Sequence, residues 1–184
     1  KNNLSLVTSL IRLKDDDLGP QVDLGDIVSH VEAVAQLHEY FQQTDEFRDI
    51  RFSSYVDRIL QTVFSHSTIG AIQFENQITD LTLSSRTATT LGLIISELAT
   101  NALKHGFDPA QPRRFTIRLE PNRDSEFTLT VENTGKPFPD TVSLQNTNSL
   151  GLRLIQVLVS QIGGAIDLRR RPSAKFTIRF SAPN

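Results

Sequence analysis

Hydrophobic residues at helical spacing open the chain and predict two helices joined by a short turn. The stripe in residues 1–14 is Leu4, Val7, Leu10 and Ile11, and the stripe in residues 24–43 is Leu24, Val28, Val31, Ala35, His38 and Phe41. Between the two stripes, the charge run and the Gly19-Pro20 pair of KDDDLGP end the first helix. Such a hairpin buries too little apolar surface to stand alone. We therefore expect residues 1–47 to pair with a second copy as a four-helix bundle; packing on the chain's own globular part is the alternative.

Residues 48–184 carry helical and strand patterns in turn. After a linker at 44–51, helices are expected over 52–66, over 84–106 with Ser84 or Ser85 as the N-cap, and over 149–164. Alternation of apolar and polar residues predicts a short strand within 69–78, a hairpin of 114–120 with 126–133, and a last hairpin within 165–180. This order predicts an α+β fold in which helices cover one face of a mixed sheet.

Composition narrows the class of protein. The 184 residues are 38% hydrophobic and 22% charged, with a net charge of -2 and a pI of about 6.1. These values are typical of a globular protein and argue against nucleic-acid binding. No apolar run is long enough to span a bilayer, no secretion signal is recognisable, and the chain has no cysteine. We expect a cytoplasmic protein without nucleic-acid or membrane contact, disulfides or a thiolate nucleophile.

The stretch SELATNALKHGF carries the strongest candidate chemistry. Its polar residues, Glu97, Asn101, Lys104 and His105, fall within about a third of the helix circumference. The amide oxygen of Asn101 is a ligand suited to Mg²⁺, and the two basic side chains can donate to phosphate oxygens. Glu97, one turn earlier, can accept a proton or orient a nucleophile. A solvated helix face is the alternative interpretation.

Two glycine-containing segments add to this pattern. VENTGKP ends a strand and turns at Gly135, where the backbone can approach a ligand closely. NSLGLRL places Gly151 at a helix start, where backbone N–H groups form an anion site that suits a triphosphate. Each motif alone is weak, and the ordered set of three is much less frequent by chance.

The ordered set resembles the ATP-binding domain shared by gyrase, HSP90, histidine kinases and MutL. ELATNALKH is similar to its N box, VENTGKP to its first glycine box, and LGLRL to its second. KNNLSLVTSLIRLK and VEAVAQLHEYF resemble the dimerisation and phosphoacceptor segment of sensor histidine kinases. The resemblance implies two domains: residues 1–47 as the dimerisation and phosphotransfer hairpin, and residues 48–184 as a two-layer α/β sandwich of the GHKL ATPase type.

The resemblance also implies roles for individual residues. Nucleotide-binding roles are implied for Asn101, Lys104, His105, Asn133, Gly135, Leu150 and Gly151. Asn101 is expected to hold Mg²⁺ against the triphosphate of ATP, and Glu97 to activate the attacking imidazole. Gly135 is expected under the adenine, and Gly151 where a short lid, residues 139–148, meets the next helix.

The implied reaction is transfer of the ATP γ-phosphoryl group to a histidine and then to an aspartate of a response-regulator receiver domain. The acceptor histidine is expected before KNNL, outside the printed chain, and the partner copy is expected to pair through the hairpin. His38, which precedes Glu39, is the alternative acceptor, although a polar position beside the bundle seam explains it better.

Three residues depart from the family pattern. Asn133 stands where an adenine-reading aspartate is usual, Pro137 where the turn has its second glycine, and Ala174 where the last hairpin has a glycine. A neutral hydrogen bond contributes about 0.5–1.5 kcal/mol against about 1.5–3 for a charged one, so nucleotide binding is expected to weaken about tenfold. The departures leave open a non-ATP-binding phosphotransfer scaffold of the same fold. A serine kinase or ATPase of the same superfamily is a second alternative, against which the KNNL hairpin counts.

Overall fold

The computed structural model of the chain describes residues 50–65, 67–79, 81–122, 126–144, 147 and 149–181. The predicted hairpin of residues 1–47, its pairing with a second copy, and His38 lie outside the described residues. These predictions and the domain boundary at residue 48 therefore stay predictions. Within the described part, no helix combines the length and the hydrophobicity that crossing a membrane requires.

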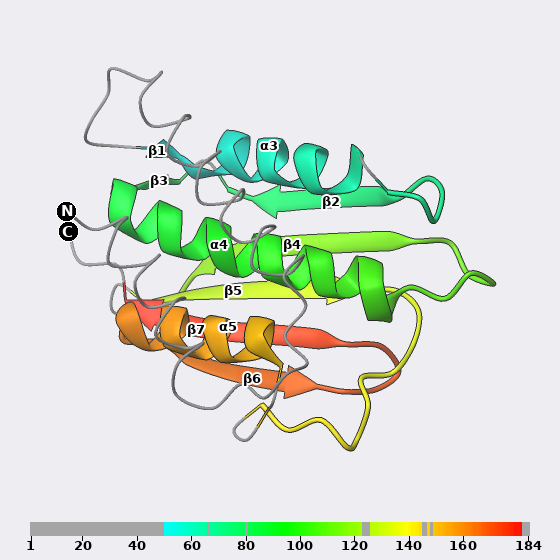
Figure 1. The fold of residues 1–184 in the computed structure, drawn as a ribbon. Coiled ribbons are helices and arrows are strands. Elements are labelled where there is room, and N and C mark those ends of the chain that lie inside the picture. Colours follow the sequence, from blue (N-terminus) through cyan, green and yellow to red (C-terminus); the bar gives the residue numbers. More distant parts are fainter. Residues whose placement is uncertain are drawn as a thin grey trace.

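Five strands form one mixed sheet in the order β2-β4-β5-β7-β6 (Figure 1). They are β2 (Gln73–Ile78), β4 (Arg114–Pro121), β5 (Glu126–Asn133), β6 (Ala165–Arg169) and β7 (Lys175–Ser181). β2 runs parallel to β4, and the other neighbours are antiparallel. The two predicted β-hairpins, 114–120 with 126–133 and the one within 165–180, are thus confirmed. Two further strands, β1 (Ile50–Arg51) and β3 (Thr82–Leu83), pair with each other; at two residues each they are too short to show a period.

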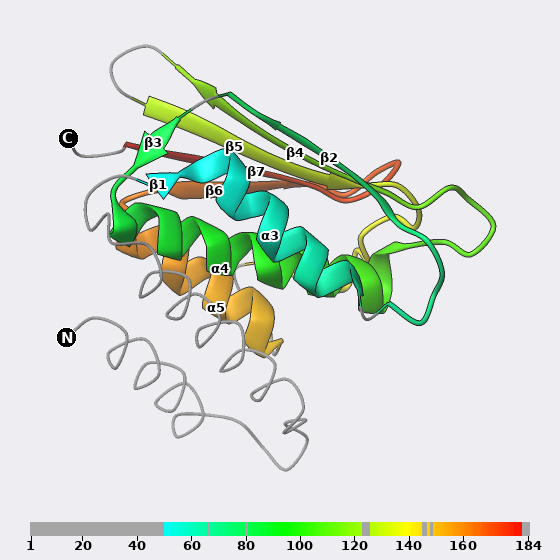
Figure 2. The same cartoon turned by 90° about the horizontal axis from the view of Figure 1, so that it is seen from above.

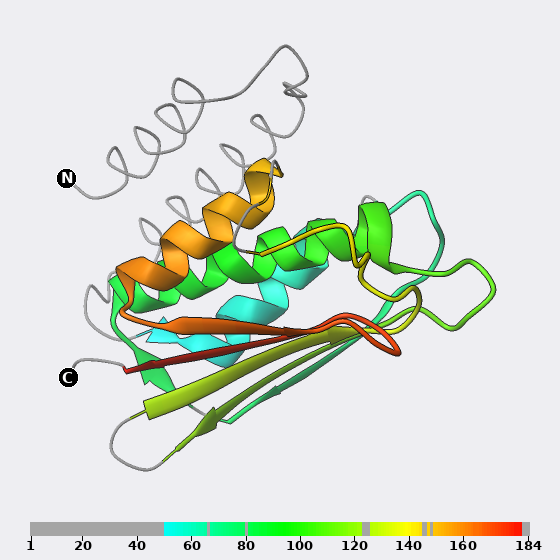
Figure 3. The same ribbon diagram turned by 90° about the horizontal axis from the view of Figure 1, so that it is seen from below.

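Three helices cover one face of the sheet. They are α3 (Phe52–Ser65), α4 (Ser85–Asn101) and α5 (Leu150–Gln161), and α4 packs between the other two. Figure 2 shows all three on the same side of the strands, and Figure 3 shows the arrangement from below. The alternation along β4 follows from this layering, because Phe115, Ile117 and Leu119 are fully buried under the helices and the residues between them are not. The predicted α+β architecture is confirmed.

The central helix α4 begins where its sequence predicts and ends in an unexpected way. Ser84 is the N-cap, and its side chain accepts a hydrogen bond from the Thr87 backbone N–H. After Asn101 the helix widens into one π-turn, η1 (Ala102–Gly106), which the Phe107 N–H closes on the Ala102 carbonyl at 3.0 Å. The expected single helix over 84–106 is therefore two elements. Such π-turns inside helices are frequent at functional sites.

A glycine sets the distance between α3 and α4. A Cβ added at Gly92 of α4 would lie 2.6 Å from the Tyr55 hydroxyl oxygen of α3, and Tyr55 is only 1% exposed. The missing side chain lets the large aromatic ring fill the space between the two helices. This close packing fixes α4, and with it the residues at its C-terminal end, against α3.

Candidate functional site

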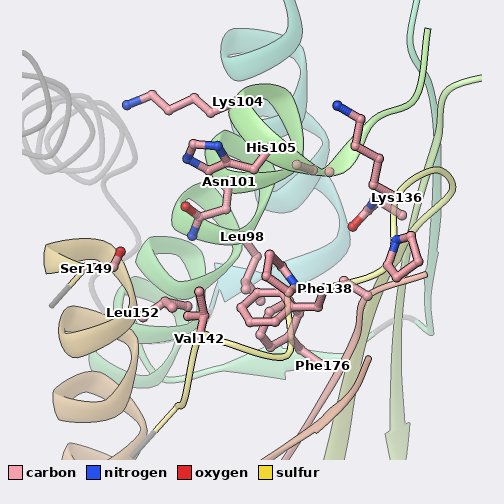
Figure 4. Close-up of a pocket in the computed structure, with 16 residues that line it drawn as sticks. Leu98, Asn101, Lys104, His105, Lys136, Phe138, Val142, Ser149, Leu152 and Phe176 are labelled. Atoms are coloured by element: carbon pink, nitrogen blue, oxygen red, sulfur yellow. The ribbon is translucent and has the colours of Figure 1, made fainter. Parts of the chain in front are cut away.

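A cavity of about 460 Å³ opens where the end of α4, the turn after β5 and the start of α5 meet (Figure 4). This volume is in the range of small-molecule sites. The lining consists of Leu98, Asn101, Ala102, Lys104, His105, Gly106, Asn133, Lys136, Pro137, Phe138, Pro139, Val142, Ser149, Leu152, Ala174 and Phe176. Three sequence segments that are far apart in the chain therefore contribute to one site.

Asn101 is the polar residue that the fold leaves unsatisfied in the cavity wall. It is the last residue of α4, and Figure 4 shows its side chain facing Ser149 and Leu152 across the cavity. Its Nδ2 atom is buried and makes no hydrogen bond within the described part of the chain. An unpaired buried polar group costs about 1–3 kcal/mol. A ligand that pairs with this amide would recover part of that cost.

Basic side chains surround the mouth of the cavity. Lys104 and His105 are carried by the π-turn η1, and Lys136 follows the turn after β5. All three residues are exposed and line the cavity. Lys104 and His105 from the π-turn and Lys136 from the turn after β5 together form a basic rim that attracts anions such as phosphate.

Two glycines allow η1 and the turn after β5 to touch. A Cβ at Gly106 would lie 2.8 Å from Nδ2 of Asn133, and a Cβ at Gly135 would lie 2.4 Å from the Gly106 carbonyl oxygen. The Lys136 N–H also donates to the Gly106 carbonyl at 2.7 Å. Gly135 has φ 121°, a backbone conformation that favours glycine. The glycine of VENTGKP is therefore required by contact between two site elements.

Asn133 presents an acceptor at the bottom of this junction. Its side chain is 6% exposed, lines the cavity, and donates from Nδ2 to the Thr134 carbonyl at 2.9 Å. This hydrogen bond fixes the amide orientation. Within the described residues Oδ1 accepts no hydrogen bond, so it remains available to a donor on a ligand.

A third glycine brings α5 against Glu97. A Cβ at Gly151 would lie 2.5 Å from the Glu97 Oε2 atom and 3.8 Å from the Asn101 Nδ2 atom. Glu97 is 6% exposed. The carboxylate and the amide therefore meet at the first turn of α5, where a helix carries a partial positive charge.

Two models of known protein families match this chain. The family model described as histidine kinase-, DNA gyrase B- and HSP90-like ATPase matches residues 87–184, more than half of the chain. The chain belongs to this ATPase family. A second model, described as histidine kinase, matches residues 1–68. Membership of the ATPase family implies that the chain binds ATP.

Named relatives of this chain are histidine kinases. The blue-light-activated histidine kinase 2 of Erythrobacter litoralis is 28% identical over 177 residues, and the sensor histidine kinase PdtaS of Mycobacterium tuberculosis is 31% identical over 176. Each alignment covers 92% of this chain, but the chain spans only 51% and 34% of these two relatives. The solved histidine kinase domain of the Erythrobacter litoralis EL346 blue-light activated kinase has a TM-score of 0.77 and 26% identity, covering 99% of this chain and 87% of that one.

The ATPase fold separates the predicted site residues into two groups. Asn101, Lys104, His105 and Asn133 line the cavity, whereas Glu97, Gly135, Leu150 and Gly151 do not. The second group lies immediately behind the wall: the glycines are contact points between site elements, and Leu150 is a buried residue that begins α5. The sequence motifs include residues of both groups, because a motif does not show whether a residue faces a ligand or packs against a neighbouring element of the site.

Most of the apolar side of the cavity was not predicted; of its residues only Val142 belongs to the segment 139–148 that was expected to be the lid. The apolar side is formed by Leu98, Phe138, Val142, Leu152 and Phe176. Leu98 and Leu152 follow the helical pattern of core residues, and Phe176 follows the strand pattern, so nothing in their spacing distinguishes them. Pro137 and Ala174, the departures from the family pattern, also line the cavity.

The fit of a metal ion rests on Asn101. No group of three or more His, Cys, Asp or Glu side chains that could hold a cation exists among the described residues. Mg²⁺ usually keeps several waters and is held by one or two protein oxygens together with substrate phosphates. The amide oxygen of Asn101, beside a cavity large enough for a small molecule, fits that pattern. The unsatisfied Nδ2 atom is a donor and would pair with a phosphate oxygen, not with the cation.

Proposed function

We propose that the chain is the kinase core of a sensor histidine kinase in a two-component system. The reaction breaks the bond between the γ-phosphorus of ATP and its bridging oxygen and forms a bond from that phosphorus to an imidazole nitrogen, with ADP leaving. The acceptor is a histidine preceding the KNNL helix, and the phosphoryl group then passes to an aspartate of a response-regulator receiver domain. The 1–47 hairpin would supply the dimer interface and the docking surface, and residues 48–184 the catalytic domain.

The observation that carries the proposal is the unsatisfied Asn101 amide in a cavity with basic and apolar sides. The basic side, with Lys104 and His105, suits a triphosphate, and the apolar side suits a purine ring. Asn133, with its free Oδ1, supports recognition of an exocyclic amino group. This division between charged and apolar walls is the one that ATP requires.

Mg²⁺, when bound, would neutralise the charge that develops on the phosphoryl group during transfer. Asn101 would hold it from the protein side. Lys104 and His105 would bind phosphate or ribose oxygens, and the apolar wall would exclude water from the base. Phosphoryl transfer depends mainly on such positioning and charge stabilisation.

Glu97 is proposed as the residue that receives or orients the imidazole proton. Its carboxylate does not line the cavity but lies beside Asn101 at the first turn of α5, within the wall that an acceptor histidine reaching the γ-phosphate would approach. Glu97→Gln keeps the shape of the side chain and removes its basicity. We expect Glu97→Gln to bind ATP like the wild type and to transfer the phosphoryl group at least about 100-fold more slowly; loss of ATP binding would instead indicate a structural role.

The test of the function uses the chain extended upstream to include the acceptor histidine. Incubation with γ-labelled ATP should give an acid-labile label on that histidine, and a receiver domain should remove it. Asn101→Asp, which adds a negative charge beside the triphosphate, should abolish labelling. Asn122→Asp is the matched control, because Asn122 is exposed at the opposite end of β4 from the cavity. Labelling that survives Asn101→Asp would show that the metal site is assigned to the wrong residue.

The second candidate, a scaffold dimer that has lost ATP, is favoured only by Asn133 and Pro137. Calorimetry distinguishes the two functions, because a scaffold gives no heat with millimolar ATP and Mg²⁺. The persistence of a 460 Å³ cavity with an unsatisfied amide in its wall supports the kinase.

A further inference from the structure

One arginine outside every recognised motif holds part of the cavity wall. Arg170 follows β6, and its guanidinium donates through Nη1 to the Pro139 carbonyl at 2.6 Å and through Nη2 to the Val142 carbonyl at 2.7 Å. Its own backbone carbonyl accepts from the Phe138 N–H at 3.0 Å, and its Cζ lies 5.3 Å from the Phe138 ring centroid. These contacts converge on residues 138–142, which we call the wall segment.

The wall segment contributes three lining residues to the cavity: Phe138, Pro139 and Val142. Phe138 also packs edge-on against Phe176 of β7, with ring centroids 5.8 Å apart and an interplanar angle of 86°. The segment belongs to no helix or strand, so no backbone ladder holds it in place. Its position against the cavity is set by Phe176 on one side and by Arg170 on the other.

The arginine fork is chemically suited to this task. Two N–H donors in one rigid plane can bond two carbonyls three residues apart, which a lysine ammonium cannot do with the same geometry. The neighbouring Arg171 pairs with Asp140 of the same segment, but their side chains are 66% and 62% exposed, and an ion pair so exposed is weak. Arg170 is therefore the stronger anchor.

We propose that Arg170 is a positioning residue for nucleotide binding: it holds the wall segment in its binding-competent position before ATP arrives. This inference rests on the proposed function of the cavity. A wall that is already in place does not have to be ordered when the ligand binds, and this preorganisation raises affinity. Arg170 itself does not line the cavity.

The experiment compares the 184-residue chain with Arg170→Ala, Arg170→Lys and the control Arg169→Ala. Arg169→Ala removes an arginine from the adjacent position, whose 2.7 Å ion pair with Glu132 does not involve the wall segment. ATP affinity is measured by calorimetry with Mg²⁺, and hydrogen exchange of the wall segment is measured without nucleotide. Arg170→Ala should weaken ATP binding about tenfold, equivalent to about 1.4 kcal/mol, and speed exchange in residues 138–142. The ATP affinity and the exchange rate of Arg170→Lys should lie between those of Arg170→Ala and the wild type. For Arg169→Ala both quantities should equal those of the wild type.

Each outcome decides one of the two proposals. If the wild type binds ATP and Arg170→Ala binds it equally well, the positioning role is wrong and the function stands. Faster exchange throughout β4 and β5 would show that Arg170 supports the whole domain and would also overturn the positioning role. If Arg170→Ala does not fold, an Arg170→Lys variant with wild-type affinity and exchange overturns the inference. If the wild type binds no ATP, the proposed function fails.

Discussion

The contact between Gly151 and Glu97 offers a sharp test of how the site is assembled. Gly151→Ala adds one methyl group in the first turn of α5, where alanine is favoured over glycine by about 0.5–1 kcal/mol. That methyl group would lie 2.5 Å from Glu97 Oε2, so the carboxylate has to move. Glu97 is 6% exposed and packed, and displacing such a group costs about 1–3 kcal/mol. After the helix preference of alanine is subtracted, the free energy of unfolding should fall by up to about 2.5 kcal/mol, with a central value near 1 kcal/mol.

A double-mutant cycle separates the two contributions. In a Glu97→Ala background the clash is gone, so Gly151→Ala should stabilise the protein by about 0.5–1 kcal/mol. Urea denaturation of the wild type, both single variants and the double variant gives the coupling energy, which should be about 2 kcal/mol. Gly151→Ala alone should also weaken ATP binding, because the displaced carboxylate lies beside Asn101. A coupling energy below about 0.5 kcal/mol would refute the reasoning, since the glycine would then not be needed to accommodate Glu97.

Three further substitutions test other parts of the structure. Gly92→Ala should lower the free energy of unfolding by about 1–3 kcal/mol, because its Cβ would meet the buried Tyr55 ring; chemical denaturation measures this, and a neutral result contradicts the close packing of α3 on α4. Asn133→Asp removes the donor to the Thr134 carbonyl and buries a charge, so the melting temperature should fall. The ATP affinity measured by calorimetry should rise about tenfold, because a charged acceptor replaces a neutral one. Weaker ATP binding would mean that this side chain does not contact the base. Gly135→Ala combines a positive φ with a backbone clash against η1, so ATP binding and thermal stability should both drop; unchanged ATP affinity would separate this turn from the site.

The strands and the central helix were predictable because their signals are local. Phe115, Ile117 and Leu119 alternate with polar residues, and that period alone assigns one face to the core. Ser84 caps α4 because its side chain reaches an N–H only three residues away. The π-turn at Ala102–Gly106 was not predictable. It differs from an α-helix by one residue in a single hydrogen-bonded turn, which is too small a change to show in the spacing of hydrophobic residues.

The site was predictable in its polar residues and not in its apolar wall. Asn101 stands out by the polar residues of its helix and Asn133 by the resemblance of VENTGKP to a glycine box, and both line the cavity. Phe138 and Phe176 look like ordinary core residues. Arg170 looks like one member of a solvated RRR run, and its role depends on carbonyls 28 and 31 residues away.

By itself, the sequence determined the three helices apart from the π-turn, the five strands of the main sheet, the α+β fold class, and the polar chemistry at the end of α4. Tertiary structure alone decided that β2 lies parallel to β4, that three glycines are contact points between site elements, and that Glu97 lies behind the cavity. The physical reason is range: periodicity and capping involve neighbours within a few residues, whereas a cavity exists only where distant segments pack together and leave space between them.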